Sequence, residues 1–133
     1  MNRGRKILMA VACCILVLSL STAALALETK SKTFIEKNVG GKRVTCSGTI
    51  SQDLATATLS SETIPWEPIM PDEAYVSHVW VAAFDIYDRR ICGSDNDGSV
   101  NATTECKINS NTWYVHYTFD YQSERLGPFK LYY

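Results

Sequence analysis

The chain has 133 residues, 46% of them hydrophobic and 20% charged, with a formal net charge of −1 at pH 7. This length fits one domain that is large enough to bury a core. Its basic residues are scattered, which argues against nucleic acid and anionic membranes as partners, because both require clustered lysine and arginine.

The N-terminus has the layout of a secretory signal peptide. Three basic residues among the first six precede an uncharged, mostly apolar run over residues 7–20, and Ala24-Leu25-Ala26 forms an A-x-A cleavage site. We therefore expect a signal peptide over residues 1–26, in the form of an N-terminal helix, and a secreted or extracellular protein. Cleavage would leave a mature chain with a net charge of about −4, because the removed segment carries three basic and no acidic side chains.

Two alternatives stay open at this end of the chain. Residues 7–27 carry no charge over a length close to that needed to cross a bilayer, so an uncleaved signal would anchor the protein in the membrane. Cys13 and Cys14 lie inside the apolar run, where acylation of one of them would make a lipoprotein, although the residues before them lack the usual pattern. After cleavage we expect no contact with a membrane.

The mature chain begins with strand patterns. Residues 27–32 are polar and predict a flexible lead-in, and residues 33–39 predict a first strand. Gly40 and Gly41 favour a tight turn, because glycine adopts positive φ without steric cost. Residues 42–51 then alternate between two kinds of side chain, small apolar and polar, which is typical of a half-buried strand.

A proline-rich segment follows the next strand, which we predict over residues 55–64. Three of the four prolines lie within residues 65–72. Because proline lacks the N–H donor and fixes φ, this segment is neither a helix nor a central strand. We expect a crossover loop, held down by Trp66 and Ile69, that joins two halves of a single domain over residues 27–133.

Residues 74–91 give the strongest strand pattern, with many aromatic and β-branched residues and no glycine or proline. Residues 79–84 are apolar on both faces, which predicts a central strand covered on both sides. The turn formers of residues 93–98 then predict a hairpin loop. Asp95 and Asp97 in this loop are a weak calcium candidate, because the loop only partly fits an EF-hand pattern and lacks flanking helices.

The last third of the chain continues the strand pattern. A short segment over residues 105–108 precedes a cleanly alternating strand over residues 112–122. One face of that strand predicts core: Trp113, Val115, Tyr117, Phe119 and Tyr121. Gly127-Pro128 predicts a turn, and residues 129–133 predict an edge strand. About seven short strands with turns between them indicate an all-β fold, a small antiparallel β-sandwich or a partly open barrel.

Three cysteines lie outside the predicted signal peptide: Cys46, Cys92 and Cys106. In an oxidising compartment we expect a disulfide between Cys92 and Cys106, which flank the turn-rich loop and would close its base. Cys46 lies in a strand pattern and is interpreted as a buried thiol. Pairing of Cys46 with one of the other two, or with a second molecule, stays an alternative.

Aromatic and histidine side chains outside the predicted core suggest a binding surface. Tyr114 and His116 lie on the opposite face of their strand, and Tyr132 and Tyr133 end the edge strand. Exposed rings of this kind bind sugars and partner proteins. His78 and His116 could bind a metal with a nearby carboxylate if their strands are neighbours, but solvent-facing polar residues are the simpler interpretation.

No motif indicates catalysis or a cofactor. The G-x-S-x-G pattern is missing, and Asp85 and Asp88 would lie on opposite faces of a strand, so they cannot act as a carboxylate pair. We expect a secreted or surface-associated binding module without catalytic activity, cofactor or metal. Its partner would be an extracellular protein or a cell-wall or host glycan. The alternative is a small secreted effector, such as a bacteriocin-like toxin or an inhibitor. The sequence does not indicate the oligomeric state.

Overall fold

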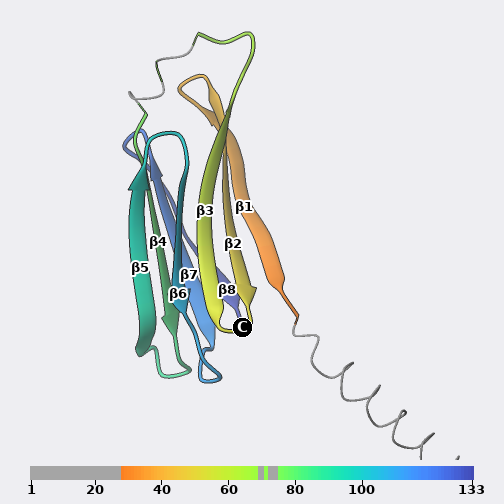
Figure 1. The fold of residues 1–133 in the computed structure, drawn as a ribbon, viewed down its shortest axis with the longest axis vertical. Helices are drawn as coiled ribbons and strands as arrows, with labels where there is room; N and C mark the ends of the chain where they lie inside the picture. Colours follow the sequence, from red (N-terminus) through yellow and green to blue (C-terminus); the bar gives the residue numbers. More distant parts are fainter. Residues whose placement is uncertain (1–27, 69–70, 72–74) are drawn as a thin grey trace, which may run out of the picture.

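The computed structural model describes residues 28–68, 71 and 75–133, in which two four-stranded antiparallel sheets pack face to face (Figure 1). This confirms the predicted all-β sandwich, with eight strands in the described residues instead of about seven. The predicted signal peptide and Ile69 lie outside the described residues.

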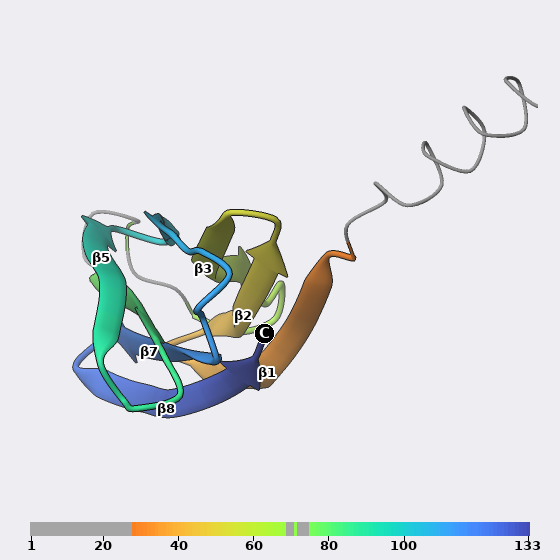
Figure 2. The same cartoon turned by 90° about the horizontal axis from the view of Figure 1, so that it is seen from below.

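The two sheets take their strands from different parts of the chain. The first sheet has the order β1-β2-β3-β6, with β1 Lys30–Val39, β2 Lys42–Ser51, β3 Leu54–Thr63 and β6 Ala102–Lys107. The second has the order β5-β4-β7-β8, with β4 Ser77–Phe84, β5 Arg90–Gly98, β7 Tyr114–Tyr121 and β8 Glu124–Tyr132. Figure 2 shows them as two layers, and the strand order makes the chain change sheets between β3 and β4, between β5 and β6 and between β6 and β7.

The core lies between the layers and is built by period-two alternation on both sides. Tyr117, Phe119 and Tyr121 point inward from β7 and are fully buried, as predicted. Gly48 on β2 makes room for one of these rings, since a Cβ at this position would lie only 2.6 Å from Tyr117. The Tyr117 hydroxyl donates to the backbone oxygen of Thr49 at 3.1 Å, so its polar end is satisfied inside the core.

A disulfide joins the two layers at one side of the sandwich. Cys92 on β5 and Cys106 on β6 form the predicted disulfide across the sheets. Cys46 is a free, buried thiol, as the sequence indicated, and burial raises its pKa to about 12. The eight strands described above and the core between the two sheets all lie within residues 28–133.

At the other side, the edge strands β1 and β8 belong to different sheets and meet through side chains. Phe34 and Phe129 stack with ring centroids 4.8 Å apart, and Lys37 forms an ion pair with Glu124. The predicted lead-in is wrong for its last residues, because Lys30–Lys32 already belong to β1. Their backbone pairs with β2 from Ile50 onward, so polar side chains here mark an edge strand.

The single strand predicted over residues 74–91 is wrong. β4 ends at Phe84, and a tight turn reverses the chain into β5. The turn has no glycine or proline; it forms because the Asp85 carboxylate accepts hydrogen bonds from the backbone N–H groups of Tyr87 (2.8 Å) and Arg89 (3.0 Å). An aspartate that binds the backbone ahead of it is a turn former that strand patterning does not reveal.

Two further turn predictions are corrected. The predicted hairpin loop over residues 93–98 lies in β5, where Asp95 pairs with Trp80 and Asp97 with His78 in the ladder of β4. Its polar residues form an exposed edge strand rather than a loop. Gly127-Pro128 lies inside β8 at a register shift. The chain instead reverses between β7 and β8 at residues 122–123, both of which have positive φ.

Two tryptophans also differ from expectation. Trp66 does not hold the crossover loop down, because 78% of its side chain is exposed. Trp113 was expected in the core but lies just before β7, with half of its surface exposed. In both cases the residue falls outside the paired strand, so alternation no longer determines its direction.

Candidate functional site

The outer faces of the two sheets differ in chemistry. On the first sheet, hydroxyl side chains lie opposite one another across β2 and β3, in the pairs Thr45–Ser60, Ser47–Thr58 and Thr49–Thr56. Threonine favours strands, and hydroxyl groups are well hydrated on a solvent-facing sheet. This face offers no aromatic ring and little apolar surface to a ligand.

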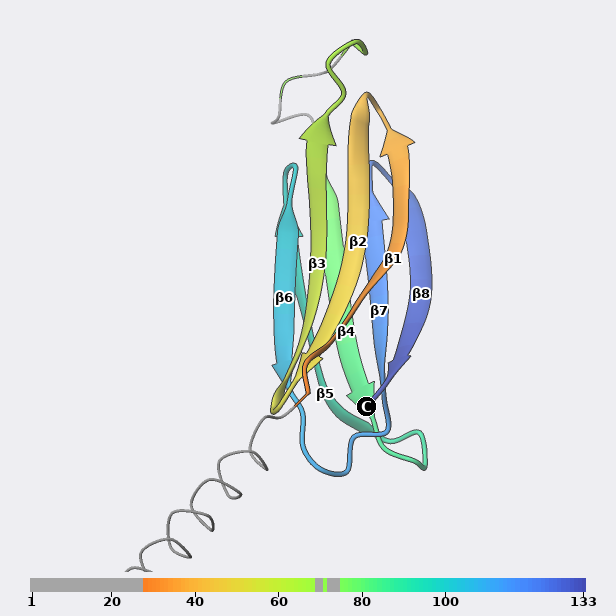
Figure 3. The same ribbon diagram turned by 90° about the vertical axis from the view of Figure 1, so that its right-hand side faces the viewer.

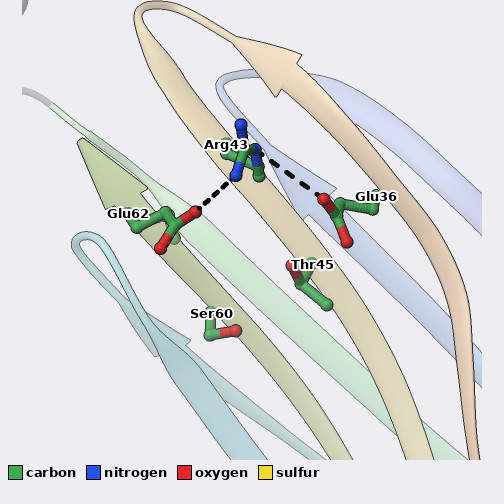
Figure 4. A pocket seen from close by; sticks show the side chains of 6 residues that line it. Glu36, Arg43, Thr45, Ser60 and Glu62 are labelled. Carbon is green, nitrogen blue, oxygen red and sulfur yellow. Dashed lines mark hydrogen bonds and ion pairs between the residues drawn. The ribbon is translucent and has the colours of Figure 1, made fainter. Parts of the chain in front are cut away.

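A shallow polar pocket of about 430 Å³ lies at one end of this face (Figure 4). Its only positive group, Arg43, points toward acidic side chains on both neighbouring strands. The guanidinium lies 2.9 Å from Glu62 on β3 and 3.7 Å from Glu36 on β1. Because Arg43 is paired with both glutamates and the pocket exposes little apolar area, we interpret it as a solvated ion-pair network with a net charge of −1.

The outer face of the second sheet carries a row of rings. We call five of its residues the aromatic face: Trp80, Phe84, Tyr114, His116 and Tyr132. Ladder pairing places Phe84 opposite Tyr114, and Tyr114 opposite Tyr132. Ring centroids are 6.3 Å apart for Tyr132 and Tyr114, 5.1 Å for Tyr114 and Phe84, and 5.5 Å for Phe84 and His116.

A depression of about 400 Å³ interrupts this row of rings. We call it the aromatic pocket, and its lining residues are Trp80, Ala82, Phe84, His116, Thr118 and Arg125. Strand alternation explains its shape: Trp80 and Phe84 project from β4 on either side of Ala82, whose methyl group forms a low floor. The expectation that β4 is covered on both sides is therefore wrong, since these side chains are only half-buried on the outer side.

Trp80 is held in place by its neighbours along the sheet. The His78 ring lies 3.8 Å from it on one side, and the guanidinium of Arg125 lies 5.2 Å from its ring. Arg125 is fixed in turn by two hydrogen bonds to the Asp120 carboxylate, of 2.9 and 3.2 Å. The pocket wall formed by Trp80 is thus preorganised before any ligand arrives.

His116 contributes a neutral ring to the pocket. Burial lowers its pKa below the ordinary 6.5, and the positive charge of Lys130, its partner across the ladder, lowers it further, while Asp88 acts in the opposite direction. A neutral imidazole has one donor and one acceptor nitrogen. At neutral pH this residue therefore offers hydrogen bonds to hydroxyl groups rather than a charge.

The structure brings three of the four predicted binding residues together. Tyr114, His116 and Tyr132 lie on the aromatic face, and Tyr132 is 53% exposed. Tyr133 lies elsewhere, in a small apolar pocket near Ile50, with its hydroxyl donating to the backbone oxygen of Gln52.

Tyr114 itself is not a surface ring, because only 7% of it is exposed. Phe84 stacks on it, the Lys130 ammonium lies 4.2 Å from its ring centroid, and its hydroxyl donates to Asp88 at 2.8 Å. That hydrogen bond and burial raise its pKa. Tyr114 therefore supports the aromatic face from below instead of contacting a ligand.

The weak calcium candidates contact a histidine. Asp95 lies 3.1 Å from Nε2 of His78, and Asp97 contacts Nδ1 of the same ring. His116 pairs with Ala82, four positions along β4 from His78, so the two histidines do not meet. Within the described residues, no group of three or more histidine, cysteine or acidic side chains is arranged to hold a metal ion.

Sequence reasoning did not assign Trp80, Phe84, Thr118 and Arg125 to a site. The signal for the first two was present: alternation places them on the same face of β4 as His78, away from the core. The apolar run of residues 79–84 led to a different prediction, because a strand that is apolar on both faces is usually covered by other layers of the protein on both faces. Arg125 lies beyond a reverse turn that was not predicted, so its place beside Trp80 could not be inferred.

Comparisons with known proteins do not identify a family. No family model matches the chain, and searches of curated proteins and of solved structures give no significant match. In the part of the chain that the structure describes, no helix is long and apolar enough to span a membrane.

Proposed function

We propose that the protein is an exported binding module without catalytic activity, and that the aromatic face binds a glycan chain of a cell wall or a host surface. One observation carries the proposal: an open pocket lies between two rings, Trp80 and Phe84, on a sheet face that no described segment covers.

The pocket chemistry suits a sugar. The C–H faces of a pyranose ring pack on flat aromatic rings, and Trp80 and Phe84 supply such rings on either side of a low floor. Sugar hydroxyl groups need donors and acceptors at the rim, which Thr118, neutral His116 and Arg125 provide. The pocket is shallow and lies within a longer row of rings, which favours a chain over a small, fully enclosed ligand.

The test measures binding of residues 28–133 to insoluble peptidoglycan and to a panel of immobilised host oligosaccharides. Trp80→Ala should weaken binding by at least about tenfold, because it removes one wall of the pocket. Ala82→Arg should do the same by filling the pocket while leaving every ring in place. Trp66→Ala is the matched control, because its ring is exposed in the segment after β3 and does not line the pocket.

The proposal is wrong if no glycan binds, or if both pocket variants bind as well as the unaltered protein. Growth inhibition of neighbouring bacteria by the purified protein would instead favour the secreted effector. Export is tested separately, by mass spectrometry of culture medium, which should find a chain that begins at Leu27.

A further inference from the structure

The turn between β4 and β5 exposes two large apolar side chains. Ile86 and Tyr87 occupy its tip and are 64% and 75% exposed. Turn positions are usually taken by glycine, proline, asparagine, aspartate or serine, which suit both turn geometry and water. Exposing an isoleucine and a tyrosine side chain to water at this position does not stabilise the fold. Neither residue lines the aromatic pocket.

The turn that presents these residues is firmly built. Asp85 accepts two backbone hydrogen bonds and a third from Nε of Arg89 at 2.8 Å, and its own N–H donates to the Arg89 oxygen at 3.0 Å. These bonds lower the pKa of Asp85, so its carboxylate stays ionised and holds the turn at physiological pH. The exposure of the tip is therefore a fixed feature of the fold.

A third exposed apolar side chain lies at the same end of the sandwich. Trp113, half exposed, donates its backbone N–H to the oxygen of Phe84 at 2.8 Å, which places it beside the base of the turn. Figures 1 and 3 show the β4–β5 turn and the segment between β6 and β7 emerging at this end. We call Ile86, Tyr87 and Trp113 the apolar tip.

We infer that the apolar tip docks on a lipid surface, with its three side chains entering the headgroup region of a bilayer. Tyrosine and tryptophan prefer this region because each combines an apolar ring with a polar group. Isoleucine has no polar atom in its side chain, so its removal from water is favourable throughout. Trp113 packs against Tyr132 at the near end of the aromatic face, with ring centroids 6.0 Å apart, whereas Trp80 lies four residues back along β4 from Phe84. Docking by the tip would therefore leave the far wall of the aromatic pocket accessible.

Charge identifies the kind of lipid surface. The turn region carries two acidic residues, Asp85 and Asp88, and two basic residues, Arg89 and Arg90, and so has no net charge. Binding should therefore occur on zwitterionic membranes and be insensitive to salt. The sequence-based expectation of no membrane contact rested partly on charge, and the apolar tip adds a route that does not use charge.

The experiment measures co-sedimentation of residues 28–133 with vesicles of phosphatidylcholine alone and of phosphatidylcholine mixed with phosphatidylglycerol. This fragment is used because the apolar N-terminal run would bind vesicles by itself. We expect binding to phosphatidylcholine vesicles and no gain in binding when phosphatidylglycerol is added, because the turn has no net charge and the mature chain carries about −4. The double variant Ile86→Ser, Tyr87→Ser should bind at least about tenfold more weakly, and Trp113→Ser more weakly by a smaller factor.

Trp66→Ser is the matched control, since this tryptophan is even more exposed than Trp113 (78% against 50%) but lies in the segment between β3 and β4, at the other end of β4 from the apolar tip, so its loss should leave binding unchanged. Near-ultraviolet circular dichroism and melting temperature confirm that each variant is folded. The inference is overturned if phosphatidylcholine vesicles do not bind the protein, if binding requires phosphatidylglycerol, or if the tip variants bind like the unaltered protein.

Discussion

Tyr114 shows how one residue can face outward and still be structural. Alternation along β7 correctly places it opposite the core residues, yet Phe84, Lys130 and Tyr132 surround its ring on the outer face. On a flat sheet, side chains from neighbouring strands lie close enough to bury one another without a further layer. The face of the sheet to which a side chain points can be inferred from the sequence. Its exposure depends on the side chains of the neighbouring strands, and these are known only once the strand order is known.

This difference predicts unequal effects of truncating two neighbouring tyrosines. Tyr114→Ala should lower the melting temperature by roughly 10 °C, because it removes a buried ring and leaves Asp88 without its donor. Tyr132→Ala should lower it by less than about 2 °C, because half of that ring is already in water. Scanning calorimetry of both variants checks this, and equal effects would contradict the burial described for Tyr114.

A second prediction concerns the protonation of His116. Its pKa, followed by NMR titration, should lie below 6.5 and should rise in Lys130→Gln, because a neighbouring positive charge is removed. The rise should be partial, since burial is the larger cause and stays. The unfolded chain binds this proton more tightly, so the residue's contribution to stability is lost as the pH falls through its folded pKa. An unchanged pKa in Lys130→Gln would contradict the assigned cause.

At the scale of the element, the sequence predicted strands well where one face is buried. β2 was predicted with its observed bounds and β7 to within two residues, because burial of one face imposes a clean period of two. The reverse turns that were missed have no glycine or proline, whereas residues 93–98 and Gly127-Pro128 were predicted as turns but lie in strands. At Asp85 a carboxylate turns the chain, and at residues 122–123 the backbone adopts positive φ with ordinary side chains.

The same reasoning explains how much of the candidate site could be predicted. His116 and Tyr132 were found because they stand out from simple alternating patterns. Trp80 and Phe84 were interpreted as covered core, since the sequence cannot say whether a second layer lies over β4. The pocket itself exists only because β4 and β7 are neighbours and β7 turns back into β8, which brings Arg125 alongside.

The disulfide between β5 and β6 gives a prediction at this scale. It closes a loop with a sequence separation of 14, which in the chain-entropy description stabilises the folded state by about 3 kcal/mol. Urea unfolding with and without reductant should show a loss of this size in the free energy of unfolding. The double variant Cys92→Ser, Cys106→Ser should be destabilised by the same amount and should be insensitive to reductant.

Cys46 should react with a thiol reagent only after unfolding, because it is buried. A native-state reaction would contradict its position.

At the scale of the whole molecule, a sandwich has four edge strands that could pair with another copy. β5 and β6 are edges of different sheets, and the disulfide ties them together. β8 contains Pro128, which has no N–H to donate, and has a register shift against β7. β1 carries the lysines Lys30, Lys32 and Lys37 and its own register shift. Each free edge thus has a feature that opposes strand addition.

We therefore predict a monomer in solution, with β1 as the edge most easily converted to a pairing surface. Lys32→Val together with Lys37→Val removes two charges, adds β-branched residues and breaks the ion pair with Glu124, so sedimentation equilibrium should detect dimers or larger species. Thr45→Val with Thr58→Val on the interior strands β2 and β3 adds comparable apolar surface away from any edge and should stay monomeric. Association of this control to the same extent would mean that apolar area drives assembly and that the lysines do not protect the edge. A dimer of the unaltered protein would mean that the features of the edge strands are insufficient to prevent pairing.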